Sequence, residues 1–385
     1  MRTAIINTTL VMPDHFIEDG VILIEDGKII DFGKATCVSV EGADIYDAGG
    51  NYTGPGLIDI HLHAGDSVPF RDDPVLAAKK CLLHGVTDLL PAPVYSRDKE
   101  AWLKMIRNIR AVMESGEAPN IIGLYMEGPY LNVGFGSNRD SAPWGHEIKL
   151  ERFKEVVDEG YDLAKVWCID PGRDNIDEFV DYVLSKDPDA IFSVAHSAAE
   201  PWQIERFIPK GLKLTTHHTN ATGTIQRYPE CRSACVDEAT LYNDKIYAEL
   251  ISDKMGIHVE PYILRLTKKI KGDDKIILVS DCSYNTGPIP DPEKYAGADD
   301  IYFDHLGEIS GSKLTLDKAC HNMMVHTGAS LCQIFKYAST NPAELLGLCD
   351  RGVIRRQNLA NLVTVDDKFN VLDVYIHGKK FNMKI

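Results

Sequence analysis

The middle of the chain alternates between short apolar runs and longer segments with helical periodicity. The apolar runs have the length and composition of buried strands, and they lie at 57–61, 86–90, 121–126, 165–169, 191–195, 212–216, 246–251 and 276–280. Helical patterns occupy most of the intervals, at 98–115, 150–159, 175–185 and 201–207. Strands that alternate with helices pair in parallel, so this order predicts an α/β fold, specifically a (β/α)8 barrel. A doubly wound open sheet is the alternative, but it normally carries a glycine-rich first turn, and Gly134-Phe135-Gly136 lacks the third glycine.

The two ends of the chain have a different pattern from the middle. Short β-branched runs separated by Asp-Gly and Gly-Gly turns fill the first part of the chain, and alternating apolar positions return near its end. Either end is too small to bury an apolar face by itself. We therefore expect residues 1–54 and 353–385 to form one small β domain together, and residues 55–352 to form the barrel domain.

Composition and charge narrow the class of protein. The chain has 385 residues, of which 44% are apolar and 25% are charged, as in ordinary enzymes. Acidic residues outnumber basic ones 57 to 41, and the net charge of −16 argues against nucleic-acid and membrane binding. The sequence has neither an apolar run of about 20 residues, as a membrane helix needs, nor a signal-peptide pattern at its N-terminus. Its nine scattered cysteines indicate a reduced, cytoplasmic protein.

Histidines and carboxylates follow five of the predicted strands, each at the C-terminal end. They are His61, His63, Glu127, His196, His217 and Asp281. In a barrel, the C-terminal ends of all strands open onto one face, where the active site lies. Imidazole and carboxylate are the ligands that zinc and similar divalent metals prefer. The sequence therefore predicts a metal site on this face.

Each of these residues has a simpler explanation when it is taken alone. A single histidine at a strand end is more often a hydrogen-bonded structural residue, and a lone Asp281 is more often a helix N-cap. His61 and His63 are more informative, because residues two apart in a strand point to the same side and can reach one ion. The coincidence at five strands favours the metal site. His218 is left out, since it should face the opposite side from His217.

Such a site supports hydrolysis assisted by one or two divalent ions, with Zn2+ expected first and Fe2+ or Mn2+ as alternatives. A bound ion lowers the pKa of water from about 15.7 toward about 7, and so supplies hydroxide to attack an amide carbonyl. Asp281 can take the proton of that water and pass it to a leaving amine, while Glu127 can bridge two ions. Serine hydrolases and P-loop NTPases are disfavoured, because the sequence has no Gly-x-Ser-x-Gly motif and no Walker loop.

The motifs that carry these residues resemble the amidohydrolase superfamily and, within it, the N-acetylglucosamine-6-phosphate deacetylases. They are PGLIDIHLHAG at 55–65, GLYMEGPYLN at 123–132, VAHSAAEP at 194–201, TTHHTNAT at 215–222, SDKMGIHVEP at 252–261 and ILVSDCS at 277–283. The resemblance covers nearly the whole chain in order. It implies a barrel with a small β-sandwich built from both termini, a homodimer, and removal of the N-acetyl group from an amino-sugar phosphate.

The resemblance also implies a role for individual positions. It assigns Glu127, His196 and His217 to the main metal site, and it makes Asp281 the acid/base. The His-x-His pair, His61 and His63, matches members that hold two metals, with Glu127 as the bridge. The positions that it implies for substrate contacts are Asn220 and Ala221 at the sugar phosphate, His258 at the substrate, and Arg227 at a phosphate across the dimer interface.

One loop departs from the family pattern and leaves the substrate open. The family usually has a Lys-Gly-Ala-His stretch after EGPYLN, whereas this chain has VGFGSNRDSAPWGH at 133–146. Arg139 lies near the expected histidine, with His146 further along, and an arginine there could bind a carboxylate or phosphate through two donors. A plain surface charge is the alternative reading of Arg139. The competing functions are a related amidohydrolase acting on an N-acyl amino acid or another anionic amide, and a non-catalytic metal-binding scaffold, which the complete ligand set disfavours.

Overall fold

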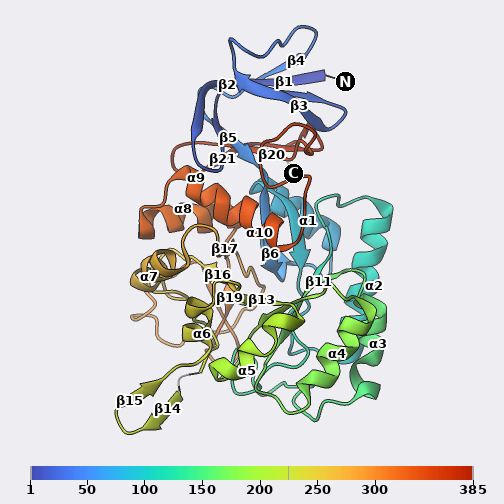
Figure 1. Ribbon diagram of the computed structural model, residues 1–385, viewed down its shortest axis with the longest axis vertical. Coiled ribbons are helices and arrows are strands. Elements are labelled where there is room, and N and C mark those ends of the chain that lie inside the picture. The colour runs from blue at the N-terminus through green and yellow to red at the C-terminus, as the bar shows by residue number, and fades with distance from the viewer. Residues whose placement is uncertain (1, 224, 384–385) are drawn as a thin grey trace.

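The two ends of the chain form a single mixed sheet. The computed structural model describes residues 2–223 and 225–383, and this sheet contains both termini in the upper part of Figure 1. The strand order is β22-β21-β20-β5-β1-β2-β3, with β4 paired to β1. These strands are β1 (Arg2–Val11), β2 (Phe16–Glu25), β3 (Lys28–Lys34), β4 (Asp44–Asp47), β5 (Tyr52–Pro55), β20 (Leu362–Val365), β21 (Val371–Ile376) and β22 (Lys379–Lys380). The antiparallel pairing of β5 with β20 joins the two ends, as the sequence predicted.

Alternation along β1 and β2 explains why this sheet is covered by apolar side chains on both faces. Successive residues of a strand point to opposite faces. Ile5 and Ile22 accordingly belong to one buried cluster, whereas their neighbours Ala4 and Val21 belong to another. Because the cluster around Ile5 also contains Leu362, residues from both ends of the chain share one core.

Eight strands of the middle region run parallel to one another in two sheets. Six pair in the order β10-β11-β12-β13-β16-β17, and β6 pairs with β9. They are β6 (Leu57–Leu62), β9 (Val86–Pro91), β10 (Leu124–Met126), β11 (Ala164–Ile169), β12 (Ile191–Val194), β13 (Leu212–Thr215), β16 (Tyr247–Ile251) and β17 (Ile276–Val279). Each predicted run coincides with one of these strands, although β10 begins only at Leu124. The α/β class is therefore confirmed.

The two parallel sheets contact each other along both edges of β6 and β9. Leu89 in β9 forms a parallel bridge with Ile121, which precedes β10. At the other edge, the amide of Asp281 donates to the carbonyl of His61 (3.0 Å), and the amide of His63 donates to the carbonyl of Cys282 (2.8 Å). The segment 61–63 is thus held directly against the end of β17.

Helices lie around the outside of the parallel strands (Figure 1). They are α1 (Pro74–Leu83), α2 (Lys99–Ser115), α3 (Leu150–Gly160), α4 (Ile176–Lys186), α5 (Pro201–Glu205), α6 (Val236–Tyr242), α7 (Pro261–Lys271), α8 (Leu316–Thr327), α9 (Leu331–Phe335) and α10 (Asn341–Leu345), with a 3-10 turn η1 (Ile208–Lys210) and a π turn η2 (Lys336–Thr340). The boundaries of α2 have clear causes, because Asp98 caps its first turn and Gly116, with φ of 71°, ends it. The four predicted helices are all present as α2 to α5.

Three small hairpins complete the structure. They are β7 (Ala64–Gly65) with β8 (Val68–Pro69), β14 (Ile225–Tyr228) with β15 (Cys231–Ser233), and β18 (Ile301–Phe303) with β19 (Ile309–Ser312). The β14–β15 hairpin extends away from the rest of the molecule at the lower left of Figure 1. Within the described residues, no helix is both long enough and apolar enough to cross a membrane.

Candidate active site

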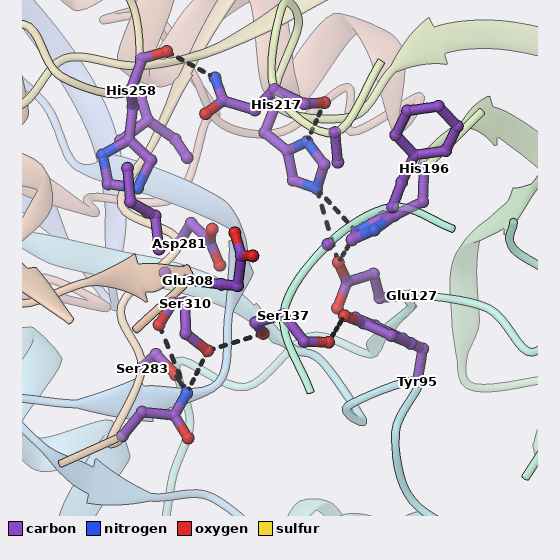
Figure 2. Close-up of a pocket in the computed structure, with 18 of the residues that line it drawn as sticks. Tyr95, Glu127, Ser137, His196, His217, His258, Asp281, Ser283, Glu308 and Ser310 are labelled. Carbon is purple, nitrogen blue, oxygen red and sulfur yellow. Dashed lines mark hydrogen bonds and ion pairs between the residues drawn. The ribbon is translucent and has the colours of Figure 1, made fainter. Parts of the chain in front are cut away.

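A cavity of about 460 Å³ opens where the C-terminal ends of the parallel strands meet (Figure 2). Its lining includes most of the residues predicted for the site, namely His63, Glu127, Arg139, His196, His217, Asn220, Ala221, His258 and Asp281. His61 is completely buried behind this lining, 4.0 Å from both Glu127 and Asp281. Arg227 is the one predicted site residue that the structure places elsewhere.

The chain turns sharply just after three of these strands. His196, His217 and Asp281 each follow the last residue of β12, β13 or β17 by two positions, and their φ angles are 42°, 31° and 46°. For a residue other than glycine, this left-handed conformation costs roughly 1–2 kcal/mol. Strain of this kind persists where the surrounding structure imposes it, and it is concentrated at functional sites. Here it turns all three side chains toward the cavity.

Two groups of potential metal ligands share one carboxylate. The first contains His61, His63 and Glu127, and the second contains Glu127, His196 and His217; within each group the ligand atoms lie within 4.8 Å of one another. Glu127 Oε2 is 3.4 Å from His63 Nε2, whereas its Oε1 is 3.0 Å from His196 Nε2. Oε1 is also the Glu127 oxygen nearest to His61 Nε2, at 4.0 Å, so Glu127 contacts ligand atoms of both groups, as a shared ligand requires.

The outer nitrogens of three histidines have hydrogen-bond acceptors, which fixes the ring orientation. Nδ1 of His61 donates to Glu249 Oε1 (2.7 Å), Nδ1 of His63 donates to the carbonyl of Ala92 (3.0 Å), and Nδ1 of His217 lies 3.2 Å from the carbonyl of Asn220. With the proton on Nδ1, each Nε2 presents its lone pair to the site, which is how metal-binding histidines are normally held.

The inner nitrogen atoms of the histidines are placed to bind a cation. His61 Nε2 is buried and has no hydrogen-bond partner among residues 2–223 and 225–383. Burial would raise the pKa of Glu127, but hydrogen bonds with His196 and His217 keep that pKa well below its usual range. Burial would lower the pKa values of His61 and His63, but the carboxylates around them outweigh this effect and raise both to about 9. The buried carboxylates thus attract positive charge to the imidazoles, and a divalent ion would supply it. This donor set fits one or two divalent ions of the zinc type.

Asp281 lies beside the first ligand group and lines the same cavity. Its Oδ1 is 3.4 Å from His63 Nε2, and the same side chain lines the cavity wall. Burial would raise the pKa of Asp281, but hydrogen bonding to His63 outweighs this effect and lowers it. An ionised carboxylate in this position can accept a proton from a molecule in the cavity.

Arg139 faces the cavity, but it already has a partner. Its guanidinium forms an ion pair with Glu308 and also approaches the carbonyl of Gly134 (3.4 Å). The two charged side chains are 41% and 46% exposed, so the pair lies at the cavity mouth rather than in its depth. His146 is exposed and lies outside the cavity lining. Of the two candidates for the missing histidine, Arg139 is the one beside the cavity.

The remaining predicted substrate contacts fall into two places. Asn220 and His258 lie together on one wall, where the Asn220 amide donates to the carbonyl of His258 (2.8 Å; Figure 2). Ala221 is next to them in the lining. Arg227, by contrast, is on β14, is 55% exposed and pairs with Glu200. Arg227 therefore lies outside the cavity of its own chain, and its expected contact across a dimer interface stays a prediction. His218 is buried outside the lining, as expected.

Sequence reasoning missed a group of polar residues on the opposite wall. They come from loops and from β19, and they are Tyr95, Ser137, Ser283, Asn285, Glu308 and Ser310. Hydrogen bonds link all of these except Glu308, whose side chain pairs with Arg139 (Figure 2). Ser310 donates to Ser137 (2.7 Å), and the Asn285 amide donates to Ser310 (2.6 Å). Short polar residues in loops carry no periodic signal, so their position could not be read from the sequence. Glu249 was also missed, although a charge inside the predicted strand 246–251 was a usable signal.

The family to which this site belongs follows from comparison with known proteins. The model of the Amidohydrolase family matches residues 53–381, so the chain belongs to the amidohydrolase family. The resemblance noted in the motifs is thereby confirmed.

Individual relatives extend the comparison to full length. The chain is 26% identical to the N-acetylglucosamine-6-phosphate deacetylase of Haemophilus influenzae, over 98% of this chain and 99% of the relative. It is 24% identical to the enzyme of the same name from Bacillus subtilis, over 96% and 94%. Among solved structures, the N-acetylglucosamine-6-phosphate deacetylase of Pasteurella multocida aligns with a TM-score of 0.85 at 23% identity, covering 99% of this chain and 100% of that one. This last similarity shows a shared fold.

Proposed function

We propose that the chain is a metal-dependent deacetylase that hydrolyses the N-acetyl group of an amino-sugar phosphate, with N-acetylglucosamine 6-phosphate as the first candidate. The observation that carries this proposal is the pair of ligand groups that share Glu127, with Asp281 beside them in the same cavity wall. The names of full-length relatives support the same substrate class. The reaction releases acetate and a free amine.

Glu127 and the four histidines would hold one or two divalent ions, of which Zn2+ is our first choice, with Fe2+ or Mn2+ as alternatives. When bound, such an ion supplies hydroxide at neutral pH and polarises the amide carbonyl. Glu249, Ala92 and Asn220 orient three of the histidine rings through Nδ1. The buried position of His61 excludes water from behind the site.

Asp281 is the group that moves the proton. As a carboxylate it accepts a proton at Oδ1 from the water that adds to the carbonyl carbon. The same oxygen then donates that proton to the amide nitrogen as the carbon–nitrogen bond breaks, so the amine leaves in neutral form.

The walls of the cavity offer separate contacts for the sugar and for its phosphate. The hydroxyls of Ser137 and Ser310, with the amide of Asn285, suit the hydroxyl groups of a sugar. Asn220, Ala221 and His258 lie opposite, where the family resemblance expects the phosphate end.

We infer that Arg227 from a second copy of the chain completes the phosphate-binding site in a homodimer. The β14–β15 hairpin that carries Arg227 extends from the molecule (Figure 1). Large aromatic side chains are exposed on this hairpin and on α5 and α6, namely Tyr228 (69%), Trp202 (62%) and Tyr242 (82%). Exposed aromatic groups of this kind are enriched at protein interfaces.

We also infer that the two parallel sheets form one closed (β/α)8 barrel, residues 55–352, and that residues 1–54 and 353–385 form a separate β-sandwich domain. Support comes from the bridge between Leu89 and Ile121 and from the hydrogen bonds that hold segment 61–63 against 281–282. The nine cysteines are all unpaired, which supports a reducing compartment such as the cytoplasm.

A panel of substrates tests the proposed function. Purified protein is assayed for released acetate with N-acetylglucosamine 6-phosphate, N-acetylglucosamine, and N-acetylated anionic amino acids. We expect the highest kcat/KM for the sugar phosphate. A preference for an amino acid would favour the related amidohydrolase, which Arg139 at the cavity mouth would suit. Metal binding without turnover of any substrate would favour the non-catalytic scaffold.

A further inference from the structure

Glu249 is a charged residue at the centre of an otherwise apolar, fully buried strand. It occupies the third position of β16, and its exposure is 0%. A buried carboxylate is costly unless it is fully hydrogen-bonded, and an apolar residue would fill this strand position at no such cost. Glu249 lies outside the cavity lining and has no contact with bound substrate to make. Its presence therefore needs another explanation.

The Glu249 carboxylate contacts both ligand groups of the site. Its Oε1 accepts from Nδ1 of His61 (2.7 Å), which belongs to the first group. The same oxygen accepts from the backbone amide of His217 (3.0 Å), which belongs to the second. In addition, the carbonyl of Glu249 accepts from the amide of His218 (2.7 Å). The strained backbone at His217 is thus anchored on both sides by one residue.

The other carboxylate oxygen ends a chain of buried hydroxyl groups. The Tyr125 hydroxyl donates to Glu249 Oε2 (2.9 Å), and because it has one hydrogen, it accepts from Thr216 (2.8 Å). Thr216 in turn is 2.6 Å from the hydroxyl of Ser193. Hydrogen bonds that run in one direction polarise one another and strengthen the last bond. This chain directs its donors at Glu249.

The result is a His61 ring with a fixed proton and a fixed plane. The acceptor at Glu249 keeps the proton on Nδ1 and leaves Nε2 free. Tyr125 stacks on the same ring, with centroids 4.4 Å apart and an interplanar angle of 14°. Glu249 thereby sets which nitrogen of His61 carries the proton, and Tyr125, which binds Glu249, sets the plane of the ring.

We propose that Glu249 is a positioning residue that holds the two ligand groups in their mutual arrangement, through the side chain of His61 and the backbone of His217. The inference rests on the proposed metal site. Glu249 would act mainly on the ion that His61, His63 and Glu127 would hold. A glutamine at this position weakens the contact with His61 in either orientation. Its oxygen is a neutral and therefore weaker acceptor, and its NH2 group, if placed there instead, would turn a donor toward Nδ1 of His61.

The test measures metal affinity rather than turnover. Wild type, Glu249→Gln and Tyr125→Phe are loaded with Zn2+ and titrated with a chelator, and the zinc retained per chain is determined by elemental analysis. Loss of an outer partner of a ligating histidine weakens metal binding by roughly 10–100-fold. We expect Glu249→Gln to lose one zinc per chain at a chelator concentration lower by this factor. Tyr125→Phe, which keeps the bond between Glu249 and His61, should show a smaller shift.

Further outcomes separate this inference from the proposed function. If folded Glu249→Gln retains zinc as wild type does, the inference is wrong and the proposed function stands. If wild type itself binds no metal, both are overturned. Should Glu249→Gln fail to fold, Glu249→Asp replaces it: the charge remains, but the carboxylate withdraws by about 1.5 Å, the length of one carbon–carbon bond. The same early loss of one zinc is expected, and wild-type retention would again contradict the inference.

Discussion

The Nε2 atoms of His196 and His217 face each other at 3.2 Å, and Glu127 Oε1 lies 3.0 Å from the first and 3.6 Å from the second. Burial would lower the pKa of His217, but its hydrogen bond to Glu127 outweighs this effect and raises it, so the cluster attracts positive charge to this ring. Three electron-rich atoms this close, all buried, repel one another unless a positive charge lies among them. The arrangement is that of a cation site, so removal of a metal from it should abolish activity.

Metal content is the first prediction. Two ligand groups predict about two equivalents of divalent metal per chain in protein purified without chelator, measured by elemental analysis. Activity should disappear on dialysis against a chelator and return on addition of Zn2+, Fe2+ or Mn2+. Fewer than about half an equivalent, with no activation by any of these ions, would contradict the site.

The proton-transfer role of Asp281 predicts a specific kinetic defect. Asp281→Asn should retain metal in the histidine groups but lose about 10²–10⁴-fold in kcat, because an amide cannot carry the proton to the leaving amine. His217→Ala is the comparison, since it should lose metal as well as activity. A near wild-type kcat for Asp281→Asn on the preferred substrate would show that another group moves the proton.

The positions of these cavity residues could be predicted from the sequence for a physical reason. Parallel strands are buried on both faces, so they appear as apolar runs, and the polar residue that ends each run marks the strand end. His196 and Asp281 were found in this way. Their exact mutual distances depend on neighbouring strand contacts, which periodicity does not contain.

Contacts between loops could not be predicted in the same way. Arg139 and Glu308 are far apart in sequence and meet only because loop 133–146 and the β18–β19 hairpin lie on the same side of the cavity. The resemblance assigned Arg227 to a phosphate across a dimer interface, but the sequence does not show that β14 carries it away from its own cavity. Assembly of two chains is outside what a single-chain pattern encodes.

Lys271 gives a prediction on stability and pH. Its ammonium group is buried and donates to the carbonyls of Thr240 (2.8 Å) and Asn243 (2.6 Å), and burial lowers its pKa from 10.5 to about 8. Between these two pKa values the unfolded chain binds more protons than the folded one, so the free energy of unfolding should rise with pH. Below about pH 8 both states are protonated and the contribution is constant.

Denaturant unfolding measured from pH 7.5 to 10.5 checks this, with Lys271→Met as the control. The difference between wild type and the variant should change in favour of wild type as the pH rises through that interval. A pH-independent difference would show that burial does not disfavour the ammonium form of Lys271.

Anion recognition by Arg139 predicts a difference between substrates. Arg139→Ala should lower kcat/KM more for a charged substrate than for a neutral analogue. The expected loss for the charged substrate is about 10- to 150-fold, because a charge-assisted hydrogen bond contributes roughly 1.5–3 kcal/mol. Glu308→Gln is the matched variant: it frees Arg139 from its present partner and should improve kcat/KM for the charged substrate. Equal small losses on both substrates for Arg139→Ala would leave the residue as a surface charge.

The proposed contribution of Arg227 across a dimer can be tested by mixing two defective chains. Arg227→Ala should lose activity on phosphorylated substrates by a factor similar to that for Arg139, while Asp281→Asn is defective on every substrate. In a mixed dimer, the Arg227→Ala chain keeps its own Asp281 and receives Arg227 from the Asp281→Asn chain, so one complete site forms.

Random pairing of equal amounts should restore about a quarter of wild-type activity, because half of the dimers are mixed and each has one such site. If the mixture is no more active than the average of its components although the chains exchange, Arg227 serves only its own chain or binds no phosphate. In the second of these cases its pairing with Glu200 would be its only role, and Asn220 and His258 would have to hold the phosphate without it.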